Sequence, residues 1–572
     1  MEAPWSFGPS AIAAFIVFIG VLIFVHELGH FLAAKYFDIK VLKFSLGFGP
    51  SLLSFTRGET TYQIAAIPLG GYVKMVGDAP GEDVHPDDRG RAFTTAPIYQ
   101  RAVIALAGPA FNLVFPILCF FAYNVLGPQV IAPIVGQIEL GQPADRAGLK
   151  PGDRILSVDG HRTWSFRRIT ELISARPGRQ VPIEVEREGQ KLELVVTPDA
   201  IRDENLFGSP EERGIIAVST TREGTRVGVV DPQKALGFST GDQVLSVDGH
   251  SVTTSDQLVR AIKQAAGRKV PVVVSRPEPK VAGDLLYASV GQPLTLEVEV
   301  PAQATGLGEL GLASSEMFLR KLVPGGAADR AGLRPGDQIL AVNGRSIRLF
   351  WSYLLEQKNA ADKPLKLTVA RGGQALELEL VAEAKTCVHD VTKKPTTLYD
   401  PGLGLGDLGP ETSCSTLQER QQTLAHWSSV VAPETEEARL SLGEALWASV
   451  RQTGEVIGFV GTGLFKLFSA EISVDNVGGP IQLFKLAAQA AEVGVFAYLR
   501  MLALISVNLG LINLLPIPIF DGGHLVFCLV EAIKRQPVSM RAREAASIIG
   551  IAILVALLVL ALRNDILSLG IF

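Results

Sequence analysis

Cysteine and charge are both scarce in this chain. Its four cysteines in 572 residues are too few for a disulfide scaffold, and only 19% of its residues are charged, with a net charge of −5 at pH 7. The sequence contains no stripe of basic residues and no glycine-rich phosphate loop ahead of a helix. These absences argue against a nucleic-acid-binding protein. The chain is also too long for a single core, so we expect several domains.

Apolar residues concentrate at the two ends of the chain. Four stretches, 11–34, 102–126, 494–515 and 544–562, are each long enough to cross a hydrocarbon layer of about 30 Å. The first stretch has no basic start and no A-x-A-like cleavage site, so we predict a retained helix rather than a signal peptide. The sequence therefore predicts an α-helical membrane core of four transmembrane helices.

Lysine and arginine gather in two of the loops that connect these stretches. By the positive-inside rule, both loops face the cytoplasm, whereas the two termini and the long middle segment face outward. In a bacterial inner membrane, the middle segment would therefore face the periplasm. The first loop carries Lys35, Lys40, Lys43, Arg57, Lys74, Arg89, Arg91 and Arg101, and the second carries Lys534, Arg535, Arg541 and Arg543.

Two histidines and a glutamate lie inside the first apolar stretch. His26, Glu27 and His30 form a His-Glu-x-x-His motif, and ionisable groups in a spanning helix are costly unless they have a function. On a helix, His26 and His30 project from the same face, so both can bind one Zn²⁺. Surface coincidence, which can explain such a motif in a soluble helix, is a poor explanation here. We predict hydrolysis within the membrane, with Glu27 as the general base.

A catalytic zinc needs a third protein ligand and one open position. The best candidate is Asp521, which follows two helix-ending prolines and precedes two glycines that permit a tight turn. Asp521 could instead cap the helix that follows, and His524 is a rival ligand on the next helical turn. In the same segment, Asn513 could hold the substrate carbonyl or satisfy backbone groups that the prolines leave free.

The middle of the chain contains a repeated phrase. Residues 143–160 return with small changes as 327–344, and residues 240–249 repeat only the second half. The phrase predicts a short helix, a turn, an apolar strand and a tight Asp-Gly or Asn-Gly turn, followed by an amphipathic helix and more strands. This pattern resembles the PDZ domain. It predicts three PDZ-like α+β domains, at 127–200, 213–302 and 306–383.

PDZ folds bind an extended peptide as an added strand, beside a loop whose backbone amides can hold a carboxylate. Candidate loops contain Val135 and Gly136 in the first copy and Leu322 and Val323 in the third. Alternatively, the three modules pack against one another as a size-selective cover. The sequence leaves both interpretations open.

The stretch after the third module is polar. Scattered proline and glycine predict a linker or irregular insert at 384–440. Cys387 and Cys414 lie in it and can form a disulfide if that compartment is oxidising. Ser441 and Glu444 have capping-box spacing, and 441–490 is predicted to be an amphipathic helical region that could lie on the outer membrane surface. The membrane core, begun at 1–126, would be completed by 491–572.

Together these motifs resemble the site-2 protease family of the bacterial regulator of sigma-E protease type. The matching pieces are His26 to His30, the 513–523 segment, residues 108–112 in the second apolar stretch and residues 68–75 in the first basic loop. The resemblance implies an intramembrane metalloprotease with one Zn²⁺ per chain. It also implies that Gly70, Gly71 and Tyr72 belong to a membrane-associated β element that presents substrate as an extended strand. The alternative for Gly70 and Gly71 is an ordinary hairpin turn.

The expected substrate is a single-span membrane protein such as an anti-sigma factor already trimmed on its outer side, with the PDZ-like modules as a filter. Three PDZ repeats where the family would have two, and the cysteine-bearing insert, depart from the pattern. One rival is a membrane-tethered PDZ scaffold with a vestigial metal site. Another is a transporter or metal carrier, but four dissimilar spans give little support for the inverted repeats that it requires.

Overall fold

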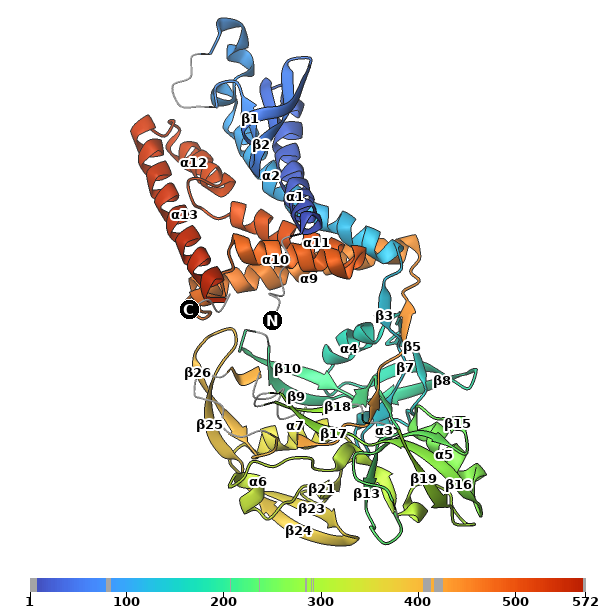
Figure 1. The fold of residues 1–572 in the computed structure, drawn as a ribbon. Coiled ribbons are helices and arrows are strands. Elements are labelled where there is room, and N and C mark those ends of the chain that lie inside the picture. Colours follow the sequence, from blue (N-terminus) through green and yellow to red (C-terminus); the bar gives the residue numbers. More distant parts are fainter. Residues whose placement is uncertain are drawn as a thin grey trace. The chain divides into compact units, whose positions relative to one another are not determined.

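The computed structural model describes residues 8–568 apart from 79–83, 206, 236, 283–284, 290, 292, 405–412 and 416–424 (Figure 1). The chain forms two compact units. The membrane unit comprises Met1–Pro128 and Ala438–Phe572, and the module unit comprises Gln129–Glu437. The module unit is therefore inserted between the two halves of the membrane unit.

Four helices in the described part of the membrane unit are long and apolar enough to cross a membrane, as the sequence predicts. They are α1 (Pro9–Tyr36), α2 (Ile98–Val125), α11 (Val495–Asn513) and α13 (Met540–Ser568). The remaining helices are α9 (Leu442–Phe468), α10 (Pro480–Val493) and α12 (Asp521–Lys534). Ser441 and Glu444 form the predicted capping box at the start of α9.

 The short helix α3 (Pro143–Arg146) belongs to the module unit.

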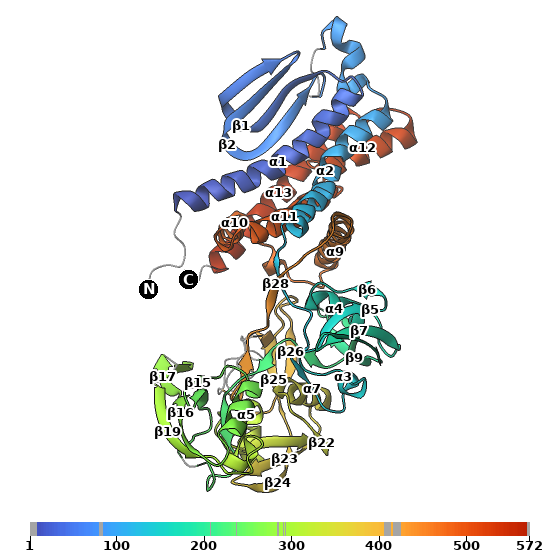
Figure 2. The same ribbon diagram turned by 90° about the vertical axis from the view of Figure 1, so that its right-hand side faces the viewer.

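A folded β-sheet lies beside α1 (Figure 2). Its two long strands, β1 (Val41–Arg57) and β2 (Thr60–Met75), each bend, so that the first part of β1 pairs with both parts of β2. Ser45, for example, lies opposite both Gln63 and Tyr72. The hairpin-turn interpretation of Gly70 and Gly71 is wrong, because both residues lie inside β2 and Gly71 pairs with Leu46.

One of the two prolines inside α2, Pro116, explains a contact between α2 and α11. Pro116 has no N–H, so the carbonyl of Asn112, four residues earlier, loses its helical partner. The hydroxyl of Ser506 in α11 donates a hydrogen bond of 2.7 Å to this carbonyl. The hydrogen bond that Pro116 removes within α2 is therefore replaced by a hydrogen bond to α11. This bond holds the α2 backbone at Asn112.

The module unit contains three four-stranded antiparallel sheets with the same strand order, β6-β5-β7-β8, β15-β14-β16-β19 and β22-β21-β23-β24. One helix packs with each sheet: α4, α5 or α7. The first module has β5 (Arg154–Val158), β6 (His161–Arg162), α4 (Phe166–Ser174), β7 (Val181–Arg187) and β8 (Gln190–Val196). The second has β14 (Gln243–Val247), β15 (His250–Ser251), α5 (Ser255–Gln264), β16 (Lys269–Ser275) and β19 (Pro293–Glu299). The third has β21 (Gln338–Val342), β22 (Arg345–Ser346), α7 (Phe350–Ala360), β23 (Leu365–Arg371) and β24 (Gln374–Leu380).

One buried ion pair recurs in all three modules. In each, an aspartate that is at most 1% exposed binds an arginine 34 residues later through both carboxylate oxygens. The pairs are Asp153–Arg187, Asp242–Arg276 and Asp337–Arg371. Because the aspartate is the one in the repeated Gly-Asp sequence, the repeat predicted from the sequence corresponds to a repeat of structure.

The stretch 384–440 is more ordered than its composition predicts. It contributes to two hairpin strands, β25 (Glu383–Val388) and β26 (Pro395–Asp400), and Cys387 forms a disulfide with Cys414. Residues 425–437, which we call the return segment, then pair with all three modules. Its strands β27 (Val430–Val431) and β28 (Thr435–Glu437) pair with β12 (Arg222–Glu223) and β3 (Gln129–Ile131), and His426 bridges to Leu319. In the described residues of 384–440, strand pairing therefore takes the place of the irregular backbone that the composition predicts.

Candidate metal centre

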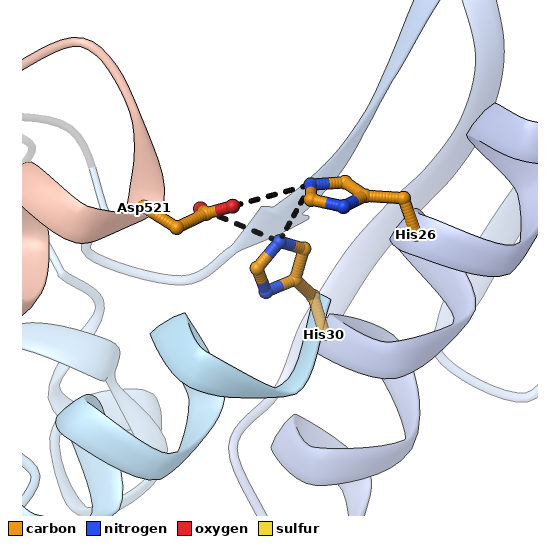
Figure 3. Close-up of side chains that lie close together, drawn as sticks. All are labelled: His26, His30 and Asp521. Carbon is orange, nitrogen blue, oxygen red and sulfur yellow. Dashed lines mark hydrogen bonds and ion pairs between the residues drawn. The ribbon is translucent and has the colours of Figure 1, made fainter. Parts of the chain in front are cut away.

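His26 and His30 lie one turn apart on α1, and Asp521 is the first residue of α12. Figure 3 shows the three side chains converging. The Nε2 atom of His26 lies 3.2 Å from Oδ2 of Asp521, and Nε2 of His30 lies 3.4 Å from Oδ1. The two Nε2 atoms are 3.3 Å apart. In the part of the chain that the structure describes, these three residues form the one cluster able to hold a metal ion.

These separations suit zinc. Ligand atoms placed at about 2.0–2.1 Å around a tetrahedral ion lie about 3.3 Å from one another. The three measured separations, 3.2, 3.3 and 3.4 Å, are close to this value. Two imidazoles and one carboxylate leave the fourth position open, which is the donor set of catalytic rather than structural zinc.

The helix-cap interpretation of Asp521 is wrong. The N-cap residue of α12 is Phe520, and no side chain caps this end of the helix. The chain reaches Asp521 through a close turn: a Cβ atom at Gly522 would lie 2.2 Å from the carbonyl oxygen of Leu515. Glycine is therefore required for Asp521 to face α1. His524, the rival ligand, lies outside the cluster, with its ring against Phe527.

The second nitrogen of each histidine is also engaged. Nδ1 of His30 lies 2.8 Å from the carbonyl oxygen of Ile104, so Nδ1 carries the proton and Nε2 presents its lone pair to a metal. Nδ1 of His26 lies 3.2 Å from the side-chain amide of Asn112. An acceptor such as the Ile104 carbonyl is typical of metal-binding histidines, because it fixes both the tautomer and the orientation of the ring.

Glu27 is 8% exposed and lies beside β2. A Cβ atom at Gly71 would be 3.0 Å from Cγ of Glu27, so the strand can approach the glutamate this closely only because residue 71 is glycine. The carboxylate of Glu27 forms no hydrogen bond or ion pair with the described residues, which leaves it available for proton transfer. Tyr72, the next residue of β2, lies opposite Ser45 and stacks with Phe48.

Asn513 is the last residue of α11, and its side chain forms no hydrogen bond with another described residue. The structure therefore places it in the segment that leads to Asp521 without joining it to the three clustered side chains. Its role stays a prediction.

The four residues of the predicted carboxylate loops are already paired within the module unit. The amide of Val135 donates to Asp153, that of Gly136 to Ser219 and that of Val323 to Gly402. Leu322 forms a β-bridge with Leu403, and Val135 is fully buried. The amides of Val135, Gly136 and Val323 are therefore occupied by carbonyls of their own chain, whereas a peptide-binding role for Leu322 stays a prediction.

Sequence reasoning missed the residues that surround the ligands. In the sequence, Asn112 and Gly108 stand out only as members of the 108–112 motif. An asparagine four residues before a helical proline is a usable signal for Asn112. A Cβ atom at Gly108 would lie 2.3 Å from Nε2 of His30. The contact between His30 and Ile104 has no sequence signal, since a backbone carbonyl can come from any residue type.

Comparison with known proteins supports the same assignment. The model of peptidase family M50 matches residues 14–557. The regulator of sigma-E protease RseP of Escherichia coli is 30% identical over 97% of this chain and 98% of its own length. Protease RseP of Yersinia pestis is 30% identical over 99% of each chain. A Vibrio cholerae protein that carries the description zinc metalloprotease is 28% identical over 96% of this chain and 97% of its own.

The match covers residues of both halves of the membrane unit and of the module unit, and it includes His26, His30 and Asp521, which could hold a metal ion. This chain therefore belongs to peptidase family M50, the zinc metalloproteases of the site-2 type.

Proposed function

We propose that this protein is an intramembrane endopeptidase in which His26, His30 and Asp521 hold one Zn²⁺. The convergence of their ligand atoms at 3.2 to 3.4 Å carries the proposal. When bound, zinc supplies a Lewis acid that activates water and polarises the scissile carbonyl. Glu27 takes the proton from the attacking water at its carboxylate and gives it to the leaving amine.

The sheet beside α1 supplies a way to present substrate. Within a helix, peptide bonds are enclosed by neighbouring turns, so a membrane-spanning substrate must unwind before hydrolysis. The Gly70–Tyr72 part of β2 is next to Glu27, and pairing with a strand gives an unwound segment backbone hydrogen-bond partners in place of water. We propose that Gly70, Gly71 and Tyr72 bind substrate in this way. Asn513 is proposed to hold the substrate carbonyl.

The proposed substrates are single-span proteins of the bacterial inner membrane, in particular an anti-sigma factor already shortened on its outer side. The names of the E. coli and Y. pestis relatives support a role in sigma-E regulation. The module unit is proposed to face the periplasm. The disulfide between Cys387 and Cys414 supports this orientation, because disulfides persist in oxidising compartments.

The three modules, at about 127–200, 213–302 and 306–383, are proposed to be PDZ-like domains that exclude substrates with intact outer domains. Their shared strand order supports three related folds. Replacing 129–437 by a short linker should then allow cleavage of an unshortened substrate. Unchanged selectivity in this variant would contradict the filter.

The proposed chemistry is tested by cleavage of a single-span reporter with purified protein. Glu27→Gln should retain zinc and lose cleavage, because the amide cannot accept the proton, whereas His26→Ala should lose both. Equal cleavage by wild type and Glu27→Gln would discard this mechanism. A wild type that binds zinc but cleaves no single-span protein would favour the rival scaffold.

A further inference from the structure

Asn112 is completely buried in α2, and its amide contacts a proposed zinc ligand. Its Nδ2 atom lies 3.2 Å from Nδ1 of His26, while its Oδ1 atom is buried and has no hydrogen-bond partner among the described residues. An unpaired carbonyl oxygen in a buried site is costly, because it loses its hydrogen bonds to water without gaining a partner. The amide therefore has an unused acceptor next to His26.

The observed contact suits His26 without a metal. Nε2 of His26 lies 3.2 Å from the Asp521 carboxylate, and a proton on Nε2 can be donated to it. Nδ1 then has a free lone pair, which accepts the hydrogen bond from Nδ2 of Asn112. Both contacts of His26 then join a donor to an acceptor, and only Oδ1 of Asn112 stays unpaired.

Zinc reverses the polarity of that contact. A histidine that binds a metal through Nε2 must carry its proton on Nδ1, so Nδ1 becomes a donor. The amide as it stands would then direct an N–H group at another N–H group. Rotation by 180° about the terminal bond of Asn112 exchanges Nδ2 for Oδ1 and gives Nδ1–H an acceptor.

We infer that Asn112 is a positioning residue for zinc, whose amide donates to His26 when the site is empty and accepts from His26 when zinc is bound. This inference rests on the proposed zinc site. Asparagine suits the role because its amide contains both a donor and an acceptor, whereas aspartate can only accept and leucine can do neither.

The backbone holds Asn112 in place for this role. Pro116 frees the carbonyl of Asn112, and Ser506 binds it at 2.7 Å. The hydrogen bond from Ser506 engages the main chain and leaves the side-chain amide free to rotate. Because α11 also leads to α12, the same contact connects the helix of Asn112 with the chain that carries Asp521.

Zinc affinity of the full-length protein in detergent, measured by competition with a chromophoric chelator, tests this inference. Asn112→Leu preserves volume and removes both hydrogen-bonding atoms, so we expect zinc to bind about 10- to 100-fold more weakly. Asn112→Asp keeps the acceptor and should bind zinc as tightly as wild type or more tightly. Asn112→Ala provides a second loss of the amide if leucine disturbs folding.

Asn124→Leu is the matched control, because it makes the same substitution at another buried asparagine of α2, whose amide contacts Ser449 and Gln452 rather than a proposed zinc ligand. We expect its zinc affinity to stay close to that of wild type. The inference is overturned if Asn112→Leu and Asn112→Ala bind zinc like wild type, or if Asn112→Asp binds as weakly as they do. Zinc binding that is equally absent from wild type and His26→Ala would instead overturn the proposed zinc site.

Discussion

Two glycines set how closely α1 and α2 approach beside the metal ligands. A Cβ atom at Gly29 would lie 2.3 Å from the carbonyl oxygen of Ala107, and one at Gly108 would lie 2.3 Å from Nε2 of His30. Both distances are far below van der Waals contact. The position of His30 therefore depends on the absence of a side chain in the neighbouring helix.

Gly108→Ala should abolish zinc binding at the site, because its methyl group would occupy the position of the His30 imidazole. We expect reporter cleavage to fall by at least about 100-fold, as is typical when a reacting group is displaced by about 1 Å. Zinc content and cleavage rate of the purified variant would be measured together.

Gly20→Ala is the control for this substitution. Gly20 lies in α1, and a Cβ atom there would meet nothing within 4 Å. Zinc content and cleavage should be unchanged. A Gly108→Ala variant that behaves like Gly20→Ala would show that α1 and α2 are not held this closely in the membrane.

At this scale, the sequence predicts residues whose roles follow from spacing. His26, Glu27 and His30 fall on one helix at fixed intervals, and the prolines and glycines around Asp521 mark a break in the helix. Asn112 is 86 residues from His26, and its contact depends on how two helices cross. Spacing along one chain segment carries no information about that crossing.

At the scale of elements, Glu139 joins the first module to the third. The corresponding helices α4 and α5 are capped by their own Ser165 and Thr254, but Leu349 stands at the equivalent position before α7. The carboxylate of Glu139 takes the part that the Gln257 side chain plays at α5: it accepts from the amides of the two residues before the helix, Arg348 at 2.8 Å and Leu349 at 3.0 Å. The third module therefore depends on the first for the start of α7.

Glu139→Ala should destabilise α7 by about 2 kcal/mol, because the buried amide of Leu349 and the part-buried amide of Arg348 both lose their acceptor. Faster hydrogen exchange throughout α7 would report the loss. Glu211→Ala, which removes an exposed glutamate of β10 (Pro210–Ile215), is the control and should leave the exchange rates unchanged. Equal rates in both variants would contradict the capping role.

Glu59 fixes the turn between β1 and β2. Its carboxylate accepts from Arg91 through two bonds of 2.8 Å and from Lys35 at 2.8 Å. Hydrogen bonds from Arg91 and then Lys35 lower the pKa of Glu59 to about 2. The turn is therefore tied both to the end of α1 and to the 3₁₀ helix η1 (Pro86–Arg91).

Because the folded-state pKa of Glu59 lies below its ordinary value of 4.5, the carboxylate stabilises the fold above that value. This contribution should be lost as the pH falls from about 4.5 towards 2. The hydrogen-exchange protection factors of the β1–β2 amides, which are corrected for the intrinsic exchange rate at each pH, should fall over this interval in wild type. In Glu59→Gln the exchange should be faster already at neutral pH, and this Glu59-dependent acid step should be missing.

At the scale of the whole molecule, the disulfide tests the proposed orientation. Cys387 and Cys414 should resist alkylation in denatured, unreduced protein isolated from cells, whereas the free and buried Cys119 and Cys528 should react. Mass spectrometry of the alkylated peptides distinguishes the two pairs. Reaction of all four cysteines would indicate a reducing compartment and contradict a periplasmic module unit.

The number of modules could be predicted from the sequence because each repeats the same turn and strand signals. Their mutual contacts could not. Glu139 and Leu349 are 210 residues apart, and the return segment pairs with strands that precede it by about 100 to 300 residues. A polar segment that gains its order from distant strands has no periodicity of its own, so 384–440 reads as irregular.

The pairing of β3 with β28 means that the chain enters and leaves the module unit side by side. Gln129 lies opposite Glu437, and the amide of Ala438 donates to Pro128 at 3.0 Å just beyond the last pair. The two ends of the module unit therefore lie next to each other in this two-stranded ribbon. Removing or exchanging the whole unit would leave only one short junction to close in the chain of the membrane unit.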